Sequence, residues 1–143
     1  MGTMTREELK AMYEKENIYN SEEFSNLENG YAILQTNLET PWKFRDYDEV
    51  VEITGKEPNR TDYNMLYVTE LDKDVLTVYG SYIQIANAIY AMFNRPDRPG
   101  INDGYYGTSL SVSDVIAIKV NNETKIYYVD GFGFKELENF IVL

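Results

Sequence analysis

The chain has 143 residues, of which 43% are hydrophobic and 14% aromatic, so it has the length and apolar content of one globular domain. It contains no cysteine and no histidine. These absences exclude disulfides, thiolate chemistry, zinc sites built from Cys or His, and imidazole acid–base catalysis. No export signal and no apolar run long enough to span a membrane occur, so we expect a cytoplasmic protein without a membrane partner.

The formal net charge of −11 is unevenly distributed along the chain. Residues 1–30 hold seven acids and three bases, residues 46–74 hold nine acids and three bases, and residues 75–120 hold three of each. A field of this sign repels nucleic acid, so we expect no direct sequence-specific DNA binding. Two interpretations remain open. The acids serve solubility, or they compete with nucleic acid for a basic channel.

The first half of the chain predicts two helices and two strands. Thr5 and Glu8 form a capping-box pattern that begins a helix at about residues 5–16, and the polar segment 17–29 is predicted to be a linker. Strands are predicted at 31–35 and 65–69. Residues 47–54 have the pattern of a short helix that ends at a left-handed Gly55. Residues 71–78 either extend the second strand or turn away from it.

The second half predicts a helix, a long loop and a hairpin. Ser81 caps a helix that extends to Phe93 and has one apolar face. Residues 94–108, rich in proline and glycine, are predicted to be a loop whose two arginines contact either the protein's own acids or a ligand. Strands at 115–120 and 125–129 form a hairpin, in which a turn centred on residues 122–123 pairs Val120 with Lys125. A last helical turn is expected within residues 135–140.

The predicted hairpin places Asp114 and Asp130 at the same end. Two neighbouring carboxylates can bind Mg²⁺ or divide into an acid and a base, although ordinary turn chemistry explains both residues as well. The alternating Ser109, Ser111 and Ser113 are expected to share one face of an extended segment. Because no histidine base exists, hydrogen bonding to the backbone is their expected role.

These elements predict an α+β fold: an antiparallel sheet of about four to five strands, with the 81–93 helix packed on one face and a peripheral N-terminal helix. We expect one domain over residues 1–143, with its core at about 30–140 and with residues 1–29 forming the N-terminal helix and linker.

Two segments of the chain resemble the YodL-like domain family: S-L-S-V-S-D-V-I at 109–116 and Y-Y-V-D-G-F-G-F at 127–134. The resemblance extends to residues 30–34, 63–68 and 89–96, and it covers about Gly30 to Phe140. The chain departs from the family pattern at Gly131, where Ser is frequent, and at Gly107-Thr108, where Gly-His is frequent.

The resemblance implies a protein of mobile genetic elements that counters host defence, because antirestriction proteins and small type II anti-CRISPR proteins look similar. We therefore expect an inhibitor without catalytic activity or cofactor, which binds a bacterial type II CRISPR effector nuclease or its guide RNA complex and blocks guide RNA or DNA engagement. The alternatives are a metal-dependent, nuclease-like enzyme that acts on guide RNA through Asp114 and Asp130, and a non-catalytic interaction module of mobile-element proteins. The candidate binding residues are Asp46, Asp48, Glu49, Glu52, Tyr105, Tyr106, Ser111, Ser113, Asp114, Tyr128 and Asp130.

Overall fold

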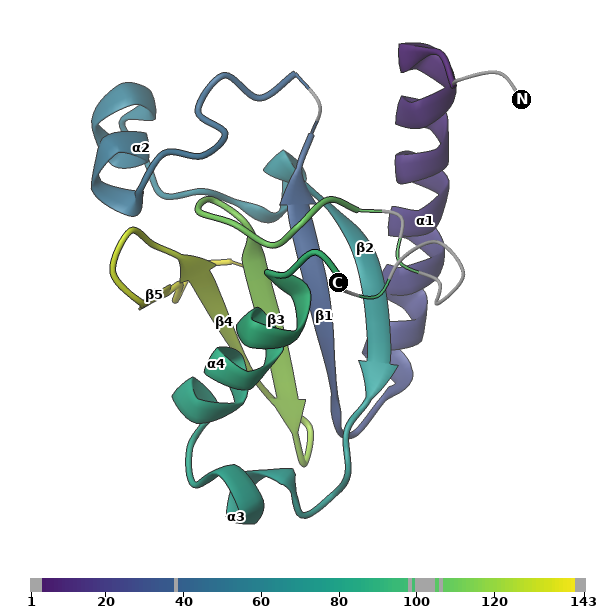
Figure 1. Cartoon of the computed structure of the whole chain (residues 1–143), viewed down its shortest axis with the longest axis vertical. Coiled ribbons are helices and arrows are strands. Elements are labelled where there is room, and N and C mark those ends of the chain that lie inside the picture. The colour runs from purple at the N-terminus through teal and green to yellow at the C-terminus, as the bar shows by residue number, and fades with distance from the viewer. Residues whose placement is uncertain (1–3, 38, 98, 100–104, 106, 141–143) are drawn as a thin grey trace.

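The computed structural model describes residues 4–37, 39–97, 99, 105 and 107–140. Within these residues, five antiparallel strands form one sheet in the order β2-β1-β3-β4-β5, which confirms the predicted α+β fold (Figure 1). The elements in chain order are α1 (Arg6–Asn26), β1 (Gly30–Thr36), α2 (Tyr47–Thr54), the 3₁₀ helix η1 (Arg60–Asp62), β2 (Tyr63–Glu70), α3 (Val75–Tyr79), α4 (Tyr82–Phe93), β3 (Val115–Val120), β4 (Glu123–Val129) and β5 (Phe134–Glu136).

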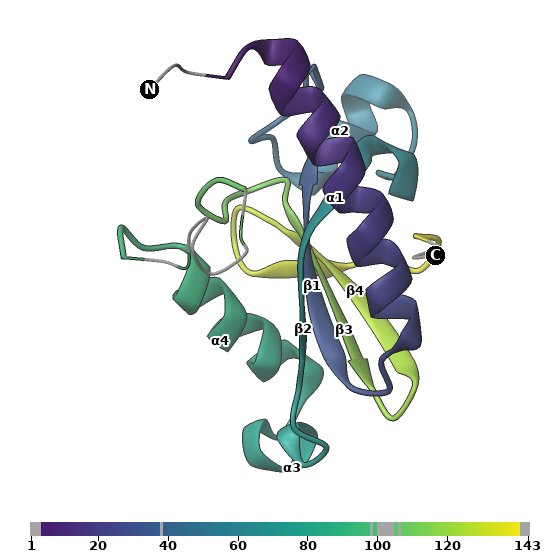
Figure 2. The ribbon, with the colours of Figure 1, turned by 90° about the vertical axis from the view of Figure 1, so that its right-hand side faces the viewer.

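Both faces of the sheet are covered, so β1 and β3 are buried along their whole length. On one face, α4 packs its apolar stripe against the sheet, as predicted, with α3 beside it (Figure 2). The core on the other face contains residues from α2, from the segment before it and from the C-terminal segment, among them Val50, Trp42 and Phe140. The centre of the sheet therefore lies between two apolar cores, which is the arrangement of a three-layered domain.

The N-terminal helix is longer and more integral than the sequence predicts. Residues 17–26, predicted to be a linker, continue α1. The helix contributes Tyr13 to the core on the α4 face and Phe24 to the core on the opposite face. Asparagines and serines suggest turns because they usually bond to their own backbone. Here some of their side chains bond to β2 and to Arg60, so tertiary contacts override the local preference.

Side chains of α1 occupy the outer edge of β2. The Met65 N–H donates to Asn17 Oδ1 at 2.8 Å, and Asn20 Nδ2 donates to the Met65 carbonyl at 3.0 Å. Arg60 reaches the same Asn17 oxygen at 2.6 Å and also donates to the Tyr63 carbonyl at 2.9 Å. An exposed strand edge is a template for pairing with another chain. These bonds satisfy backbone groups of Tyr63 and Met65, at the start of β2, that a further strand would otherwise use.

The hairpin of β3 and β4 differs from its predicted register by two residues. Val120 pairs with Glu123, and Ile118 pairs with Lys125. The turn residues are Asn121 and Asn122, both with positive φ (51° and 66°). Asparagine tolerates this left-handed region, and a two-residue turn of this kind matches the twist of the flanking strands. Because the shift is an even number of residues, each side chain stays on its predicted face.

Three further predictions were tested by the structure. The helix at 47–54 and its left-handed Gly55 (φ 77°) are confirmed. Residues 71–78 turn away from β2 and form most of α3. The helical turn expected within residues 135–140 is wrong, because the tight turn before it, in which Asp130 N–H donates to the Gly133 carbonyl, reverses the chain and pairs β5 with β4.

We expect Asn17→Ala to lower the free energy of unfolding by about 1–3 kcal/mol, because it leaves Met65 N–H without an acceptor and removes one partner of Arg60. Urea denaturation followed by circular dichroism measures the loss. Tyr19→Ala is the matched control, because Tyr19 lies on the same helix and is 65% exposed. It should change stability by less than about 0.5 kcal/mol. Equal stability of Asn17→Ala and the wild type would contradict the role of this side chain at the strand edge.

Candidate functional site

Most of the sequence-predicted binding residues meet at one corner of the molecule. We define the α2 corner as residues 43–57, 111–114 and 128–136, three segments that converge beside α2 (Figure 1). Hydrogen bonds connect the segments: Tyr128 Oη donates to the Arg45 carbonyl at 2.5 Å, and the Phe44 N–H donates to Ser113 Oγ at 2.9 Å. Residues far apart in the sequence thus form one connected surface region.

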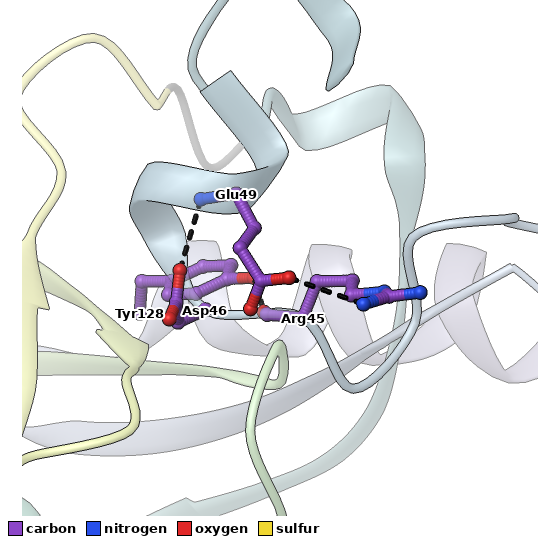
Figure 3. A network of polar contacts seen from close by, with 4 residues as sticks. All are labelled: Arg45, Asp46, Glu49 and Tyr128. Atoms are coloured by element: carbon purple, nitrogen blue, oxygen red, sulfur yellow. Dashed lines mark hydrogen bonds and ion pairs between the residues drawn. The ribbon is translucent and has the colours of Figure 1, made fainter. Parts of the chain in front are cut away.

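Two carboxylates of the α2 corner bind the first turn of α2. Asp46 is the N-cap, and its Oδ1 accepts from the Glu49 N–H at 2.9 Å (Figure 3). Asp130, at the end of β4, accepts from the Tyr47 N–H at 3.0 Å. Free N–H groups and the helix dipole at this end favour negative charge. Asp46 and Asp130 therefore have a structural role, and one oxygen of each carboxylate, Oδ1, is already engaged.

The remaining acids of α2 differ in whether their carboxylates have a partner within the protein. Glu49 forms an ion pair with Arg45, with Arg45 Nη1 and Glu49 Oε2 3.1 Å apart (Figure 3). Asp48 and Glu52 are exposed and, within the described residues, form no ion pair or side-chain hydrogen bond. These two carboxylates are the acids of α2 that keep their charge available to a partner.

The turn at 111–114 contains a strained residue. Ser113 has φ 85° and is fully buried, with its carbonyl accepting from Tyr63 Oη at 2.7 Å. Phe44, its hydrogen-bond partner, also has a positive φ of 73°. Such a conformation costs a non-glycine residue on the order of 1–2 kcal/mol. The predicted extended segment with all three serines on one face is therefore wrong, because Ser113 turns inward while Val112 is half-buried.

Asp114 is buried, with 1% of its surface exposed, and its Oδ2 accepts from Gln35 Nε2 at 3.0 Å and from the Ser111 N–H at 2.9 Å. Its Oδ1 has no partner within the described residues. Burial raises the pKa of this carboxyl to about 6, against the opposing charge of Lys43. Gln35 also binds both backbone groups of Thr108, so Asp114 helps to anchor the segment that follows the long loop.

Asp114 and Asp130 do lie at the same end of the hairpin, since the Val129 N–H donates to the Asp114 carbonyl at 2.8 Å. The raised pKa of Asp114 comes from burial and not from repulsion by Asp130. In the described ranges, no group of three Asp, Glu, His or Cys side chains is placed to bind a metal ion. The geometry therefore gives the hypothesis of a carboxylate-bound metal no support.

The tyrosines among the predicted residues are not exposed where the structure describes them. Tyr128 is fully buried, and Tyr105 is 1% exposed and packs against Phe93, with ring centroids 5.1 Å apart. Tyr106 lies outside the described residues. Sequence reasoning missed two exposed phenylalanines of the same corner, Phe44 at 63% and Phe132 at 103%. Gly131 and Gly133, on either side of Phe132, indicate a turn in the sequence, and a turn could have suggested that this ring is exposed.

An open groove of about 950 Å³ lies outside this corner, between α1, residues 37 and 39–42, and the start of β2. Lys10 and Arg60 line it together with three acids, Glu14, Glu39 and Asp62. Its charge is mixed, and none of the sequence-predicted residues lines it. The groove therefore does not favour a ligand of either sign, and the α2 corner remains the candidate site.

One of the two arginines in the predicted loop contacts an acid of the protein itself: Arg95 pairs with Asp97 at 2.7 Å. Arg98 lies outside the described residues. None of the helices that the structure describes is long and apolar enough to cross a bilayer.

The raised pKa of Asp114 predicts a pH-dependent stability. The value is 3.8 when unperturbed and about 6 in the folded state, so the folded protein binds this proton more tightly. Stability from this group is therefore present below pH 3.8 and is lost as pH rises to about 6, by on the order of 2–3 kcal/mol.

Asp114→Asn removes this titration. Between pH 3.8 and about 6, the wild type should therefore lose unfolding free energy relative to the variant as the pH rises. Urea titrations at several pH values measure it. A difference independent of pH would contradict the assignment.

Comparison with known proteins gives a family match, and its span agrees with the boundaries of the sheet. The family model described as YodL-like domain matches residues 30–140. No curated protein and no solved structure matches the chain. The matched span begins at the first residue of β1 and contains the five described strands and the whole α2 corner, while α1 lies outside it. With more than half of its length matched, the chain belongs to the YodL-like domain family.

Proposed function

We propose that this protein is an anti-CRISPR inhibitor, encoded by a mobile genetic element, that acts in the bacterial cytoplasm. It binds a type II RNA-guided nuclease, or the complex of that nuclease with its guide RNA, and blocks engagement of guide RNA or DNA. The observation that carries the proposal is the uncompensated negative charge of a chain with net charge −11. RNA-guided nucleases hold guide and target in positively charged channels, which an acidic protein can occupy in their place.

The distribution of ion pairs supports this mechanism. Within the described part of the chain, the three ion pairs engage Glu39, Glu49 and Asp97 alone among the acids. Internal pairing would cancel the attraction of the acids for a basic channel. Acids such as Asp48 and Glu52 instead remain exposed. Charged rims of this kind mainly raise the association rate and make it dependent on salt.

The acids do not form one continuous face. The segment 46–74, which holds nine acids and three bases, is divided by β2, so α2 lies at one end of the sheet and residues 70–74 lie near α3 at the other (Figure 1). The helix α1 runs between the two ends along β2 and carries seven acids together with its flanking residues 1–30. We place the contact with the nuclease at the α2 end, because the family match includes it and the candidate residues gather there.

A cleavage assay tests the proposal. Several type II nucleases of different origin, each loaded with guide RNA, cut a target DNA with or without an excess of this protein. We expect at least one of them to lose cleavage, with the guide RNA intact afterwards. Unchanged cleavage by every nuclease would refute the inhibitor proposal. Binding without loss of cleavage would favour the interaction module, and Mg²⁺-dependent loss of guide RNA that is abolished by Asp130→Asn would favour the enzyme.

Removing the free charge of α2 tests the mechanism. We expect the double variant Asp48→Asn/Glu52→Gln to associate with the inhibited nuclease about 3–10 times more slowly at low salt, with a weaker dependence on salt. Biolayer interferometry over a salt series measures the rates. Glu22→Gln/Glu23→Gln is the control, because it removes the same charge from exposed sites in the C-terminal part of α1, the part farther from α2 (Figure 1). This variant should change the association rate less. Equal effects of the two variants would contradict a contact at α2.

A further inference from the structure

The ring of Phe132 is exposed to solvent and does not belong to either hydrophobic core of the protein. Its side chain is 103% exposed, more than any other large apolar side chain in the described residues. A single exposed apolar residue is ordinary on a protein surface. Phe132, however, stands at the tip of a tight turn between two glycines, so nothing of its own chain shields the ring.

The turn that carries Phe132 is held on both sides. Asp130 N–H donates to the Gly133 carbonyl, and the Gly131 N–H donates to Asp130 Oδ1, both at 2.9 Å. On the far side, the ring of Phe134 packs edge-on against Tyr90 and Tyr127, with centroids 6.2 and 6.3 Å apart. An apolar side chain on a preorganised turn loses little conformational entropy when a partner binds it.

Other exposed apolar side chains belong to the same corner. Phe44 is 63% exposed, three residues before Tyr47, whose N–H bonds to Asp130. Ile53 of α2 is 58% exposed. The positive φ of Phe44 adds to this picture, because strained non-glycine residues are retained where the surrounding structure over-determines them and often where a ligand binds.

The charges of the α2 corner indicate the chemistry of the partner. The corner holds eight acids and four bases. Three of the bases are occupied: Arg45 by Glu49, Lys43 by the Phe44 ring and Thr36, and Lys135 by the Tyr47 ring. Lys56 is the exposed exception. A second copy of this chain would bring the same acids face to face, whereas a surface rich in Lys and Arg complements them.

We propose that Phe132, assisted by Phe44, is the anchor by which the α2 corner docks into an apolar pocket rimmed by lysines and arginines on a partner protein. The choice of a nuclease as the partner rests on the proposed function. The chemistry of the contact does not depend on it. Aromatic anchors that fill a pocket typically carry much of the binding energy of an interface, and rim charges carry less.

The test uses two probes with the full chain. One is a guide-loaded nuclease that the cleavage assay shows to be inhibited. The other is a synthetic amphipathic peptide built only of leucine and lysine, with a lysine/serine peptide of equal charge as its comparison. We expect Phe132→Ala to weaken binding of the nuclease and of the leucine/lysine peptide about tenfold through faster dissociation, with Phe132→Trp restoring it. Val78→Ala is the control, because Val78 is 75% exposed on α3 at the other end of the sheet.

The outcomes separate this inference from the proposed function. If no nuclease is inhibited but peptide binding depends on both the leucines and Phe132, the proposed function fails and the docking surface stands. If Phe132→Ala binds the probes as the wild type does, or Val78→Ala loses as much affinity, the inference is wrong. Dimers of the wild type in light scattering that disappear in Phe132→Ala would also overturn it, since they would assign the ring to self-association.

Discussion

One carboxylate oxygen, Oδ1 of Asp130, holds the candidate site together. It accepts the Tyr47 N–H at the start of α2 and the Gly131 N–H of the turn that follows β4. The first bond joins the start of α2 to the end of the hairpin, where the ring of Tyr47 also packs against Tyr128 of β4. The second shapes the turn that displays Phe132. A polar bond between backbone and carboxylate thus positions both the free acids of α2 and the exposed ring.

This use of carboxylates explains why negative charge is not equally available over the molecule. Asp46, Asp114 and Asp130 satisfy backbone or amide donors that would otherwise be buried without partners. These three carboxylates therefore serve the fold through their hydrogen bonds, although burial makes the charged form of Asp114 unfavourable. Asp48 and Glu52 have no such task and face solvent. The α2 corner therefore contains acids that are hydrogen-bonded within the fold and exposed acids without such bonds. The exposed acids are a physical basis for attracting a basic surface.

The helix α1 shows that a segment outside the family match can be integral to the fold. The matched residues begin at β1, yet Tyr13 and Phe24 contribute to the two cores, and the amides of Asn17 and Asn20 bond to the backbone of Met65 in the edge strand β2. Lys119 extends the same connection, because its ammonium donates to the Phe24 carbonyl at the end of the helix. An edge strand without such a cover is a template for pairing with another chain. In this protein, α1 provides it.

The sequence by itself determined the fold class, the family and the chemistry that is excluded. Local signals suffice for these conclusions: the capping residues of α1 and α4, the left-handed Gly55, the apolar runs of β1 and β3, the family motifs, and the absence of histidine and cysteine. The hairpin register was wrong because the turn was centred one residue late, although Asn121-Asn122 carries the signal for a two-residue turn.

Only the tertiary structure decided that Tyr105 and Tyr128 are buried, that Ser113 turns inward, and that Asp48 and Glu52 remain free. Burial and partnership depend on residues that are distant along the chain, such as Arg45 for Tyr128 and Phe44 for Ser113. No periodicity within one segment encodes such contacts.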